Sequence, residues 1–508
     1  MIDFIDSLLN KITMYRLVLY YLIVLVAVAM IFGAFGILPY SPLSLLFSVT
    51  ALTLIAWITN TVFAKLFKAQ PNAESAYITA LILTLIITPQ SPTTTGFFAF
   101  IAWAAIWSMA SKYIFAFHKK HIFNPAAFAV ALTAFTIHQS ASWWVGGNLP
   151  MMAFVIVGGL LVIRKIQRFD LALPFFAAAF ASIVFTSGSP DAFGTIEKAI
   201  LHTPIFFFAF IMLSEPLTTP PTRPLRIMYA VFVGLLYAPR VHFGPIYSTP
   251  ELALLAGNIF SYFVSPKKKY VLPLAQKKEV GAGIYDFAFA TSEKMNFMPG
   301  QYMEWTIGHR GTDTRGNRRY FTIASSPTEK TLRLGVRFAT DAPSSFKKAM
   351  LTLQPGDTIV GGQLAGDFTL PEDKTKKLAF IAGGIGITPF RSMIKYLADS
   401  GEKRDAILFY SNRTTAEIAY KDVFDEAELK LGFRTLYAIT NDEETPPAKN
   451  GHKGRVDDAL IAREIPDYKD RIFYLSGTHT MVTAFEKTLH DMGVSRTQIK
   501  IDFFPGFA

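Results

Sequence analysis

Residues 378–389 read LAFIAGGIGITP, an apolar run that leads directly into a glycine cluster. The run predicts a buried strand over 378–382, and the apolar spacing after Pro389 predicts a helix that begins there. Glycines at 383, 384 and 386 would let backbone N–H groups approach a pyrophosphate, and the start of the helix adds the positive end of its dipole. The spacing differs from the GxGxxG fingerprint of dinucleotide-binding folds. A strand-to-helix turn without a ligand is the alternative interpretation.

A second motif, RYFT at 319–322, combines a guanidinium, an aromatic ring and a hydroxyl on one extended stretch. In a strand, Arg319 and Phe321 share one face while Thr322 points to the other. This pattern suits a flavin nucleotide, with Arg319 at the phosphates, Phe321 at the ring or ribityl chain and Thr322 toward the flavin N5. By itself the motif also fits an ordinary exposed strand. Together the two motifs predict electron transfer from a nicotinamide to a flavin.

Eight short motifs follow one another in a recognisable order. They are PGQY at 299–302, RYFTIAS at 319–325, GVRF at 335–338, PGD at 355–357, GDF at 366–368, GGIGITP at 383–389, YSNRT at 410–414 and YLSGTHTMV at 474–482. In this order they resemble the ferredoxin–NADP reductase superfamily over residues from about 268 to 508. The resemblance implies an FAD-binding antiparallel β-barrel over 266–371, followed by an α/β domain that binds NAD(P)H over 372–508.

The same resemblance implies individual roles for residues of this chain. The flavin site would comprise Arg319, Tyr320, Phe321, Thr322, Ala324, Ser325, Ser344 and Ser345. The nicotinamide nucleotide site would comprise Gly383, Gly384, Gly386, Thr388, Arg413, Gly477, Thr478 and Met481. The catalytic residues would be Thr322, Ser476 and Phe504, with Phe503 as the alternate to Phe504.

Three points of this resemblance stay open at the level of sequence. Many superfamily members carry a Cys beside the nicotinamide where this chain has Ser476, so the rate of hydride transfer is not fixed. The C-terminal IDFFPGFA only partly matches the aromatic tail that covers the flavin. Arg413 could meet the 2′-phosphate of NADPH or stack on adenine, so both nucleotides remain candidates. FAD is expected rather than FMN.

The residues before 265 are of a different kind. They hold eight of the 38 acidic residues of the chain, and the whole chain contains 46 Phe among 508 residues. A membrane-spanning helix needs about 20 apolar residues. Such segments predict a polytopic α-helical membrane domain over 1–265 with about ten spans, near 15–37, 43–64, 76–89, 96–117, 123–138, 144–163, 169–187, 197–214, 225–239 and 246–264.

Basic residues between these segments predict their orientation. With the N-terminus inside, the inner loops carry nearly all of the Lys and Arg, and the outer loops hold only Lys198 and Arg240. The chain is therefore expected in the inner (cytoplasmic) membrane with both termini in the cytoplasm, and the first apolar segment is not a cleavable signal peptide. The net charge of +11 then reflects topology and lipid headgroups, and no basic-aromatic module points to nucleic acid.

The chain contains no cysteine, which excludes disulfides and Cys-ligated iron–sulfur clusters. Electrons that leave the flavin must reach another flavin, a haem, a quinone or a separate redox protein. Ferric reductases pair a similar reductase domain with haem-bearing helices, but that requires two facing His pairs. Here His118 and His121 lie in a lysine-rich loop, where contact with solvent or lipid headgroups explains them more simply. No metal site is predicted.

A second resemblance concerns the apolar half. FNPA at 123–126, EPLTTP at 215–220 and GNIFSYFVSP at 257–266 resemble the flavin-carrying membrane proteins of the sodium-translocating NADH:quinone oxidoreductase and of the related Rnf complex. That implies a second flavin, FMN or riboflavin, or a quinone in the membrane domain. In the family a flavin is commonly attached to a Thr, but the matching place here, HQSAS at 138–142, ends in Ser142, so a non-covalent flavin is expected. Alternatively, Asn124 and Pro125 only begin a helix.

The function expected from the sequence is a membrane-bound flavin oxidoreductase. Hydride would pass from NAD(P)H to FAD in the cytoplasm, and electrons would continue to a flavin or quinone in the lipid bilayer, with ion translocation as a possible accompaniment. Two alternatives belong to other classes: a transporter or channel with a regulatory reductase domain, and a haem-type transmembrane ferric reductase. Absorbance of the membrane half would separate electron transfer from transport.

Overall fold

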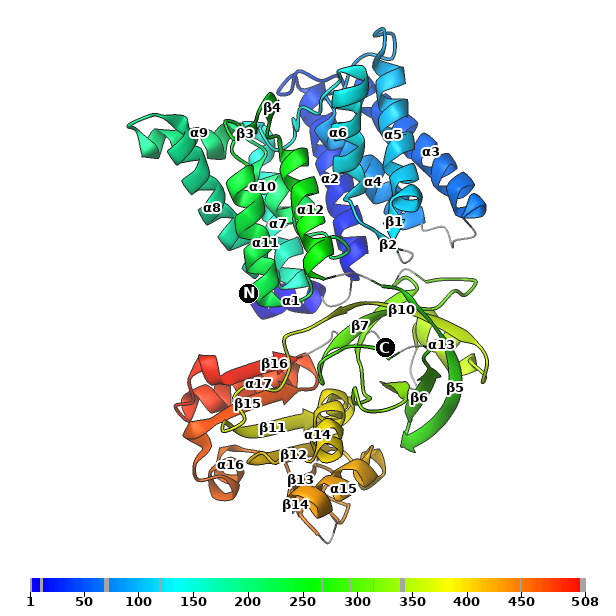
Figure 1. The fold of residues 1–508 in the computed structure, drawn as a ribbon, viewed down its shortest axis with the longest axis vertical. Coiled ribbons are helices and arrows are strands. Elements are labelled where there is room, and N and C mark those ends of the chain that lie inside the picture. Colours follow the sequence, from blue (N-terminus) through cyan, green and yellow to red (C-terminus); the bar gives the residue numbers. More distant parts are fainter. Residues whose placement is uncertain are drawn as a thin grey trace. The chain divides into compact units, whose positions relative to one another are not determined.

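The computed structural model describes residues 2–9, 12–67, 73–117, 120–265, 268–292, 294–313, 315–338, 343–447 and 449–502. The chain divides into two compact units, Met1–Lys269 and Tyr270–Ala508 (Figure 1). The first unit is helical, whereas the second contains two six-stranded sheets with helices.

Helices occupy every segment of the first unit that the apolar pattern indicates. They are α1 (Ile2–Leu9), α2 (Met14–Ala34), α3 (Pro42–Leu66), α4 (Ala73–Ile86), α5 (Phe97–Ile114), α6 (Pro125–Ile137), α7 (Leu149–Ile166), α8 (Phe169–Ser187), α9 (Ala192–His202), α10 (Ile205–Phe207) with the π-helix η1 (Phe208–Met212), α11 (Arg223–Leu236) and α12 (Pro250–Val264). Two short hairpins join some of them, β1–β2 (Ala116–Phe117 and Lys120–His121) and β3–β4 (His242–Phe243 and Ile246–Tyr247).

The number of spans differs from the expected ten. Among the described residues, five helices are long and apolar enough to cross a membrane: α2, α3, α5, α7 and α8. A sixth span results if α9 and the α10–η1 segment count as one, but they meet at an angle of 71° beside Pro204. The helices α4, α6 and α12 are apolar but shorter than 18 residues. Proline and polar caps divide the apolar runs into shorter helices than hydropathy alone indicates.

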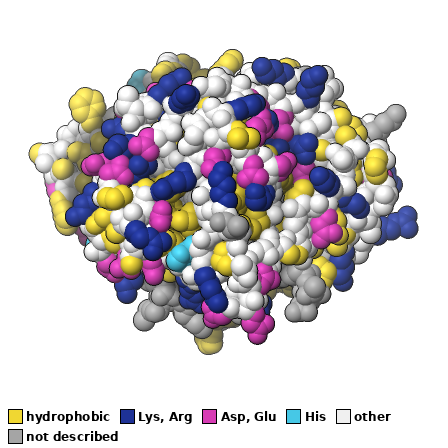
Figure 2. All heavy atoms as spheres, turned by 90° about the horizontal axis from the view of Figure 1, so that it is seen from below, with side chains coloured by type: hydrophobic (Ala, Val, Ile, Leu, Met, Phe, Trp, Pro, Cys, Tyr) yellow, Lys and Arg dark blue, Asp and Glu magenta, His cyan; other side chains and the backbone are white. Residues whose placement is uncertain are grey.

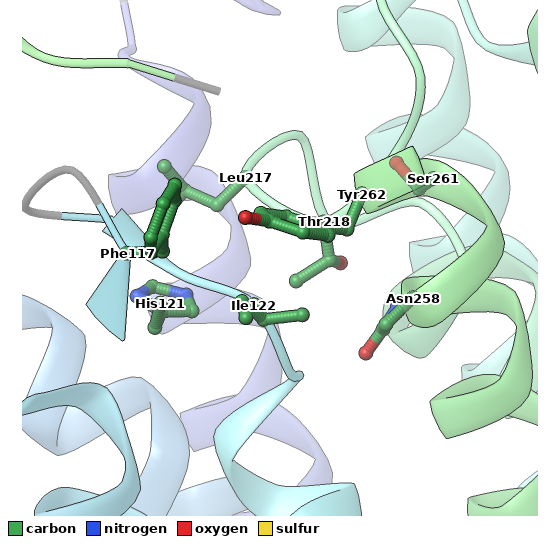
Figure 3. A pocket seen from close by; sticks show the side chains of 8 residues that line it. All are labelled: Phe117, His121, Ile122, Leu217, Thr218, Asn258, Ser261 and Tyr262. Atoms are coloured by element: carbon green, nitrogen blue, oxygen red, sulfur yellow. The ribbon is translucent and has the colours of Figure 1, made fainter. Parts of the chain in front are cut away.

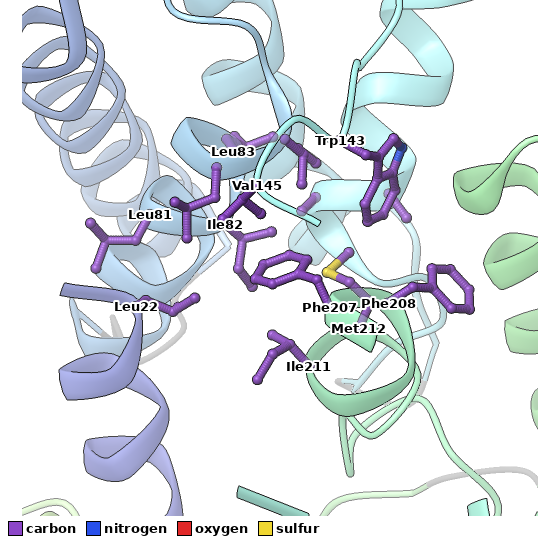
Figure 4. Packing of buried hydrophobic residues seen from close by; sticks show 14 of the residues in the cluster. Leu22, Leu81, Ile82, Leu83, Trp143, Val145, Phe207, Phe208, Ile211 and Met212 are labelled. Atoms are coloured by element: carbon purple, nitrogen blue, oxygen red, sulfur yellow. The ribbon is translucent and has the colours of Figure 1, made fainter. Parts of the chain in front are cut away.

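The core of the first unit is built largely from aromatic and branched side chains. Phe207 and Phe208 pack with Trp143 and Val145, and Figure 4 shows this packing from close by. The loop that carries Trp143 is anchored because the backbone N–H groups of Ser142 and Trp143 both donate to the carbonyl of Ile86 at 2.9 Å. This loop, which the sequence places between two spans, is therefore part of the packed interior.

The first sheet of the second unit is antiparallel and has the order β8-β7-β10-β5-β6-β9. Its strands are β5 (Tyr270–Gly281), β6 (Ile284–Ala290), β7 (Tyr302–Thr306), β8 (Arg318–Thr322), β9 (Thr331–Arg337) and β10 (Thr358–Ala365), and the helix α13 (Ser345–Thr352) accompanies them. The expected closed barrel is wrong, because the edge strands β8 and β9 do not pair as a ladder. Among the described residues, one backbone hydrogen bond joins the two sides, from Ala324 N–H to the carbonyl of Arg333 at 2.9 Å.

The second sheet is parallel and has the order β14-β13-β12-β11-β15-β16. Its strands are β11 (Lys377–Gly383), β12 (Ala406–Asn412), β13 (Arg434–Ile439), β14 (Gly451–Lys453), β15 (Arg471–Ser476) and β16 (Ile499–Asp502). The helices between them are α14 (Thr388–Ser400), α15 (Lys421–Leu431), α16 (Asp458–Glu464) and α17 (His479–Asp491). The predicted strand before the glycine cluster is the central β11, and the predicted helix is α14.

Charged side chains of both signs are interspersed over the face of the molecule in Figure 2. Thirty of the 38 acidic residues follow residue 265, so mixed charge is a property of the second unit. Such a surface suits contact with water.

Candidate functional site

The strand β8 presents its side chains as the alternation predicts. The Arg319 guanidinium lies over the ring of Phe346 at 5.2 Å, and the Phe321 ring is 6.0 Å from the same ring. Thr322 faces the other way, where its hydroxyl makes a long hydrogen bond of 3.5 Å to Asp502 Oδ2. Arg319 and Phe321 thus share a face, and Thr322 lies on the opposite one.

Cationic side chains gather around Arg319. Burial lowers the pKa of Arg319 to about 10, with Asp313 raising it and Arg315 lowering it further. Burial also lowers the pKa of Lys347 to about 8, and Arg319, Arg315 and Arg337 add electrostatic repulsion. A half-buried lysine among three arginines is costly without an anion, because charge must be compensated where water is scarce. The chemistry of this donor set fits the diphosphate of a flavin dinucleotide.

Ser344 and Ser345 begin the helix α13 beside this cluster. The Ser344 hydroxyl caps the helix by accepting from Lys347 N–H at 3.3 Å. The Asp313 carboxylate accepts from Ser345 N–H at 2.8 Å and pairs with Arg315 at 2.9 Å. Burial opposes ionisation of Asp313, but these hydrogen bonds outweigh it and hold its pKa below the ordinary value. A carboxylate therefore lies at the helix start, where a phosphate would have to compete with it.

Ala324 and Ser325, expected at the flavin, connect the two sheets of the second unit. The carbonyl of Ala324 accepts from Arg391 Nη1 at 2.9 Å, and the carbonyl of Ser325 accepts from the Ser392 hydroxyl at 2.6 Å. Both donors belong to α14, which follows the glycine cluster. The segment after β8 is therefore fixed to the nucleotide-binding half.

Five side chains close a ring across this same boundary. Arg391 forms a bidentate pair with Glu329, whose second contact is 2.9 Å, and Glu329 also lies 3.3 Å from Arg333 Nε. Arg333 pairs with Asp286, which accepts from the Tyr420 hydroxyl at 2.9 Å. The Arg391 guanidinium lies 5.4 Å from the centre of the Tyr420 ring and so completes the ring. The sequence analysis does not include this network, because Asp286 and Tyr420 alone are 134 positions apart.

Tyr320 points away from the cation cluster. Its hydroxyl is 3.1 Å from Glu304 Oε2 and 2.8 Å from Gln363 Oε1, and its ring meets that of Tyr302 edge-on at 5.8 Å. These contacts fix Tyr320 within the sheet, on the face that Thr322 shares.

The glycine cluster forms a tight turn, the 3₁₀ helix η2 (Gly384–Ile387), between β11 and α14. A Cβ atom on Gly386 would lie 2.4 Å from the carbonyl oxygen of Ser476, and one on Gly383 would lie 2.1 Å from Met481 Sδ. The glycines thus allow this turn to pack against the turn after β15, where Gly477 also approaches Met481. The structure confirms close backbone approach, and the immediate neighbours are protein atoms.

The remaining residues expected at the nucleotide lie around this pair of turns. Thr388 donates its hydroxyl to the carbonyl of Ile385 at 3.2 Å. Thr478 caps α17 by accepting from Met481 N–H at 3.4 Å. Arg413 is exposed just beyond the carboxyl end of β12, where its backbone N–H donates to Glu417 Oε2 at 3.3 Å. The parallel strands β11, β12 and β15 therefore end at one edge of the sheet, as ligand sites of open α/β sheets do.

An acid that the sequence analysis does not contain lies at this edge. The register of β15 and β16 places Ser476 beside Asp502, and Thr322 reaches Asp502 from β8. Burial raises the pKa of Asp502 to about 7, and the hydrogen bond from Thr322 opposes this only partly. Asp502 and Thr322 are 180 residues apart, so only the fold brings them together. Phe503 and Phe504 lie outside the described residues.

Comparison with known proteins supports the same site. Residues 380–487 match the family of oxidoreductase NAD-binding domains. The chain is 26% identical over 216 residues to a flavohemoprotein of Bacillus cereus, covering 41% of this chain and 53% of the relative. It is 29% identical over 200 residues to a component of the Na(+)-translocating NADH-quinone reductase of Yersinia pestis, covering 37% and 49%.

The chain spans about half the length of these curated relatives. Among solved structures, the flavohem-like FAD/NAD-binding domain of the Vibrio cholerae nitric oxide dioxygenase is 18% identical, with a TM-score of 0.41, covering 46% of this chain and 98% of that one. Among the described residues, no group of three or more His, Asp or Glu side chains could hold a metal ion. The second unit carries the nucleotide-binding domain of an NAD(P)H-dependent flavin oxidoreductase, and the expectation of an enzyme of this class is confirmed.

Proposed function

We propose that the chain is a membrane flavoprotein that oxidises NAD(P)H through FAD and delivers the electrons to an acceptor in its first unit. The observation that carries this proposal is the meeting of Thr322, Ser476 and Asp502 at the edge of the parallel sheet, with the cation cluster on the neighbouring β8. Bound FAD would supply the ability to accept a hydride and to release electrons singly.

The residues around that site have separable tasks. Arg319 and Lys347 would hold the flavin phosphates, because their charges have no equivalent compensation from the protein alone. Thr322 would orient the redox-active edge of the flavin by hydrogen bonding. Asp502, whose pKa is raised to about 7, would hold or release a proton near the same edge at physiological pH. Ser476 would line the nicotinamide side in place of a thiol.

The nucleotide would bind along the paired glycine turns. Gly383, Gly384, Gly386 and Gly477 leave the backbone accessible, and Thr388, Thr478, Met481 and Arg413 surround them. Movement of the Met481 side chain would open the space over Gly383 and Gly477, since both lie against its sulfur.

The first unit would place the acceptor in the inner membrane. Its five long apolar helices support a multi-pass arrangement, and the basic residues between them support cytoplasmic termini. The acceptor would be a quinone or a second flavin (FMN or riboflavin), as the FNPA and EPLTTP motifs suggest. A flavin there would be bound non-covalently, because the Ser142 hydroxyl is already engaged: it accepts from Thr88 at 2.6 Å and donates to the Ile86 carbonyl at 3.3 Å.

The test is cofactor content and acceptor use of the full chain purified in detergent. Arg319→Glu should lose FAD, because it removes a charge-assisted contact worth about 1.5–3 kcal/mol, or about 10- to 150-fold in Kd. Arg434→Glu, at a half-exposed arginine of β13, is the control. Retention of wild-type FAD in Arg319→Glu would refute the flavin site. Failure of the wild-type enzyme to reduce a short-chain quinone would refute quinone as the acceptor.

A further inference from the structure

The two polar motifs of the first unit meet in its interior. The Asn124 side-chain amide donates to Glu215 Oε2 at 2.9 Å, and the Asn124 backbone N–H donates to Asn258 Oδ1 at 2.7 Å. Asn124 and Asn258 are 4% and 1% exposed. The residues come from the start of α6, the turn after η1 and the middle of α12, which lie 91 and 134 positions apart. This is a polar site assembled by the tertiary fold within an otherwise apolar unit.

The hydrogen bonds of this site leave one pair of atoms uncommitted. Glu215 Oε2 already accepts from Asn124 and from the Thr218 hydroxyl at 3.1 Å. Asn124 Oδ1 caps α6 by accepting from Ala127 N–H at 3.0 Å. The other carboxylate oxygen, Glu215 Oε1, faces Nε2 of His121 at 3.9 Å. Because the amide oxygens already have donors, a metal cation would find too few ligands here. A carboxylate opposite an imidazole is instead a place for a proton.

A small cavity adjoins the imidazole. Its volume is about 10 Å³, close to the space that one water molecule needs. Figure 3 shows its lining, which includes His121, Thr218, Asn258 and Ser261. His121 Nε2 and Ser261 Oγ are both buried and make no hydrogen bond with any described residue. A single water would satisfy both atoms and connect the pair to the end of α12.

Other charged and titratable groups around the pair are few. Lys112 of α5 and Lys269 both act on His121 electrostatically. Lys112 itself donates to Ser75 Oγ at 3.0 Å and Thr79 Oγ1 at 3.2 Å. Tyr229 of α11 hydrogen-bonds Asn258 at 3.4 Å, and Tyr262 of α12 lines the cavity. These cations favour an ionised Glu215, which leaves His121 as the group that gains or loses the proton.

We propose that His121 and Glu215 form a proton-binding site that serves reduction of the acceptor in the first unit. Reduction of a quinone consumes two electrons and two protons, and an electron added to a low-dielectric interior is costly unless a proton accompanies it. The neutral His121 binds a proton beside the Glu215 carboxylate, passes it through the cavity water to the reduced acceptor, and is then reprotonated from the aqueous side. This inference rests on the proposed transfer of electrons into the first unit.

Two electron acceptors separate this role from the others. NAD(P)H oxidation by the purified full chain is measured with ferricyanide, which takes electrons without protons, and with a short-chain quinone. In His121→Ala and Glu215→Gln, the ferricyanide rate should stay at the wild-type value, while the quinone rate should fall about 100-fold. Glu215→Gln keeps an acceptor for Asn124 and Thr218. The control Glu251→Gln alters another buried carboxylate of the first unit, bound to Trp143 Nε1 at 2.9 Å, and should leave both rates unchanged.

Added imidazole distinguishes proton transfer from a structural role. In His121→Ala it should restore the quinone rate, and methyl-substituted imidazoles should shift the pH profile according to their own pKa. A quinone rate that is unchanged in both variants, or reduced without any response to imidazole, would overturn the inference while the proposed function stands. A wild-type enzyme that reduces ferricyanide but no quinone or internal acceptor would overturn both.

Discussion

Replacing Glu329 by Gln should destabilise the second unit strongly, although Glu329 lies in no strand or helix. Glu329 forms the bidentate pair with Arg391, and the two side chains are only 14% and 5% exposed. Burial alone would lower the pKa of Arg391, but the hydrogen bonds and charge of Glu329 outweigh this and raise it. The substitution removes that charge and leaves a buried guanidinium.

The structure sets the expected magnitude. Arg391 keeps its hydrogen bond to the Ala324 carbonyl and its position over the Tyr420 ring, so it does not lose every partner. Removing one member of a buried ion pair typically costs about 3–5 kcal/mol. Because Glu329 also accepts from Ser326 N–H at 2.7 Å and contacts Arg333, the segment after β8 should loosen as well. We therefore expect a loss of at least about 3 kcal/mol, with weaker retention of flavin.

The assay is denaturant unfolding of the full chain in detergent, followed by the fluorescence of flavin as it is released. Asp425→Asn is the matched control, because its partner Lys421 and Asp425 itself are about half exposed and lie four positions apart on α15. Exposed pairs of this kind contribute only about 0.3–0.5 kcal/mol. If Glu329→Gln unfolds within about 1 kcal/mol of the wild type, the buried pair does not stabilise the boundary in the way argued here.

Two further predictions concern the edge of the parallel sheet. The pKa of Asp502 is raised by burial from 3.8 to about 7, so its ionisation costs stability as pH rises through that interval; relative to the wild type, Asp502→Asn should gain stability between about pH 4 and pH 7 and level off above. Denaturation midpoints of both proteins across this range measure it, and parallel curves would contradict it. Gly386→Ala should slow NAD(P)H oxidation but retain FAD, because its Cβ would lie 2.4 Å from the Ser476 carbonyl oxygen; an unchanged KM and kcat would show that the two turns can separate without consequence.

The sequence predicts elements well where a local pattern determines them. The alternation of RYFT places Arg319 and Phe321 on one face of β8, and the structure agrees. The glycine cluster lies between a strand and a helix, as its flanks indicate. Asn124 caps α6 as its position before Pro125 suggests, yet it also binds Glu215, so both interpretations of FNPA hold.

The sequence predicts less well where apolarity has two possible causes. The helix α4 is buried at every residue from Thr79 to Ile86, so its apolar run reflects packing inside the unit. Hydropathy does not separate such a helix from one that faces lipid. Long-range partners are also beyond a local pattern: Asp502 meets Thr322 only through the stacking of β8 and β16 at one site. The open edges β8 and β9 replace the expected closed barrel for the same reason.

The two carbonyl hydrogen bonds from α14 to Ala324 and Ser325 also affect the life of the protein in the cell. A ligand that binds only the folded form stabilises it by about 2.7 kcal/mol at 100 times its Kd. Since the flavin segment and the nucleotide-binding helix share these bonds, occupancy by the vitamin-derived cofactor would protect both from proteolysis. Riboflavin supply would then set the abundance of the enzyme as well as its activity, and starved cells would clear the empty chain.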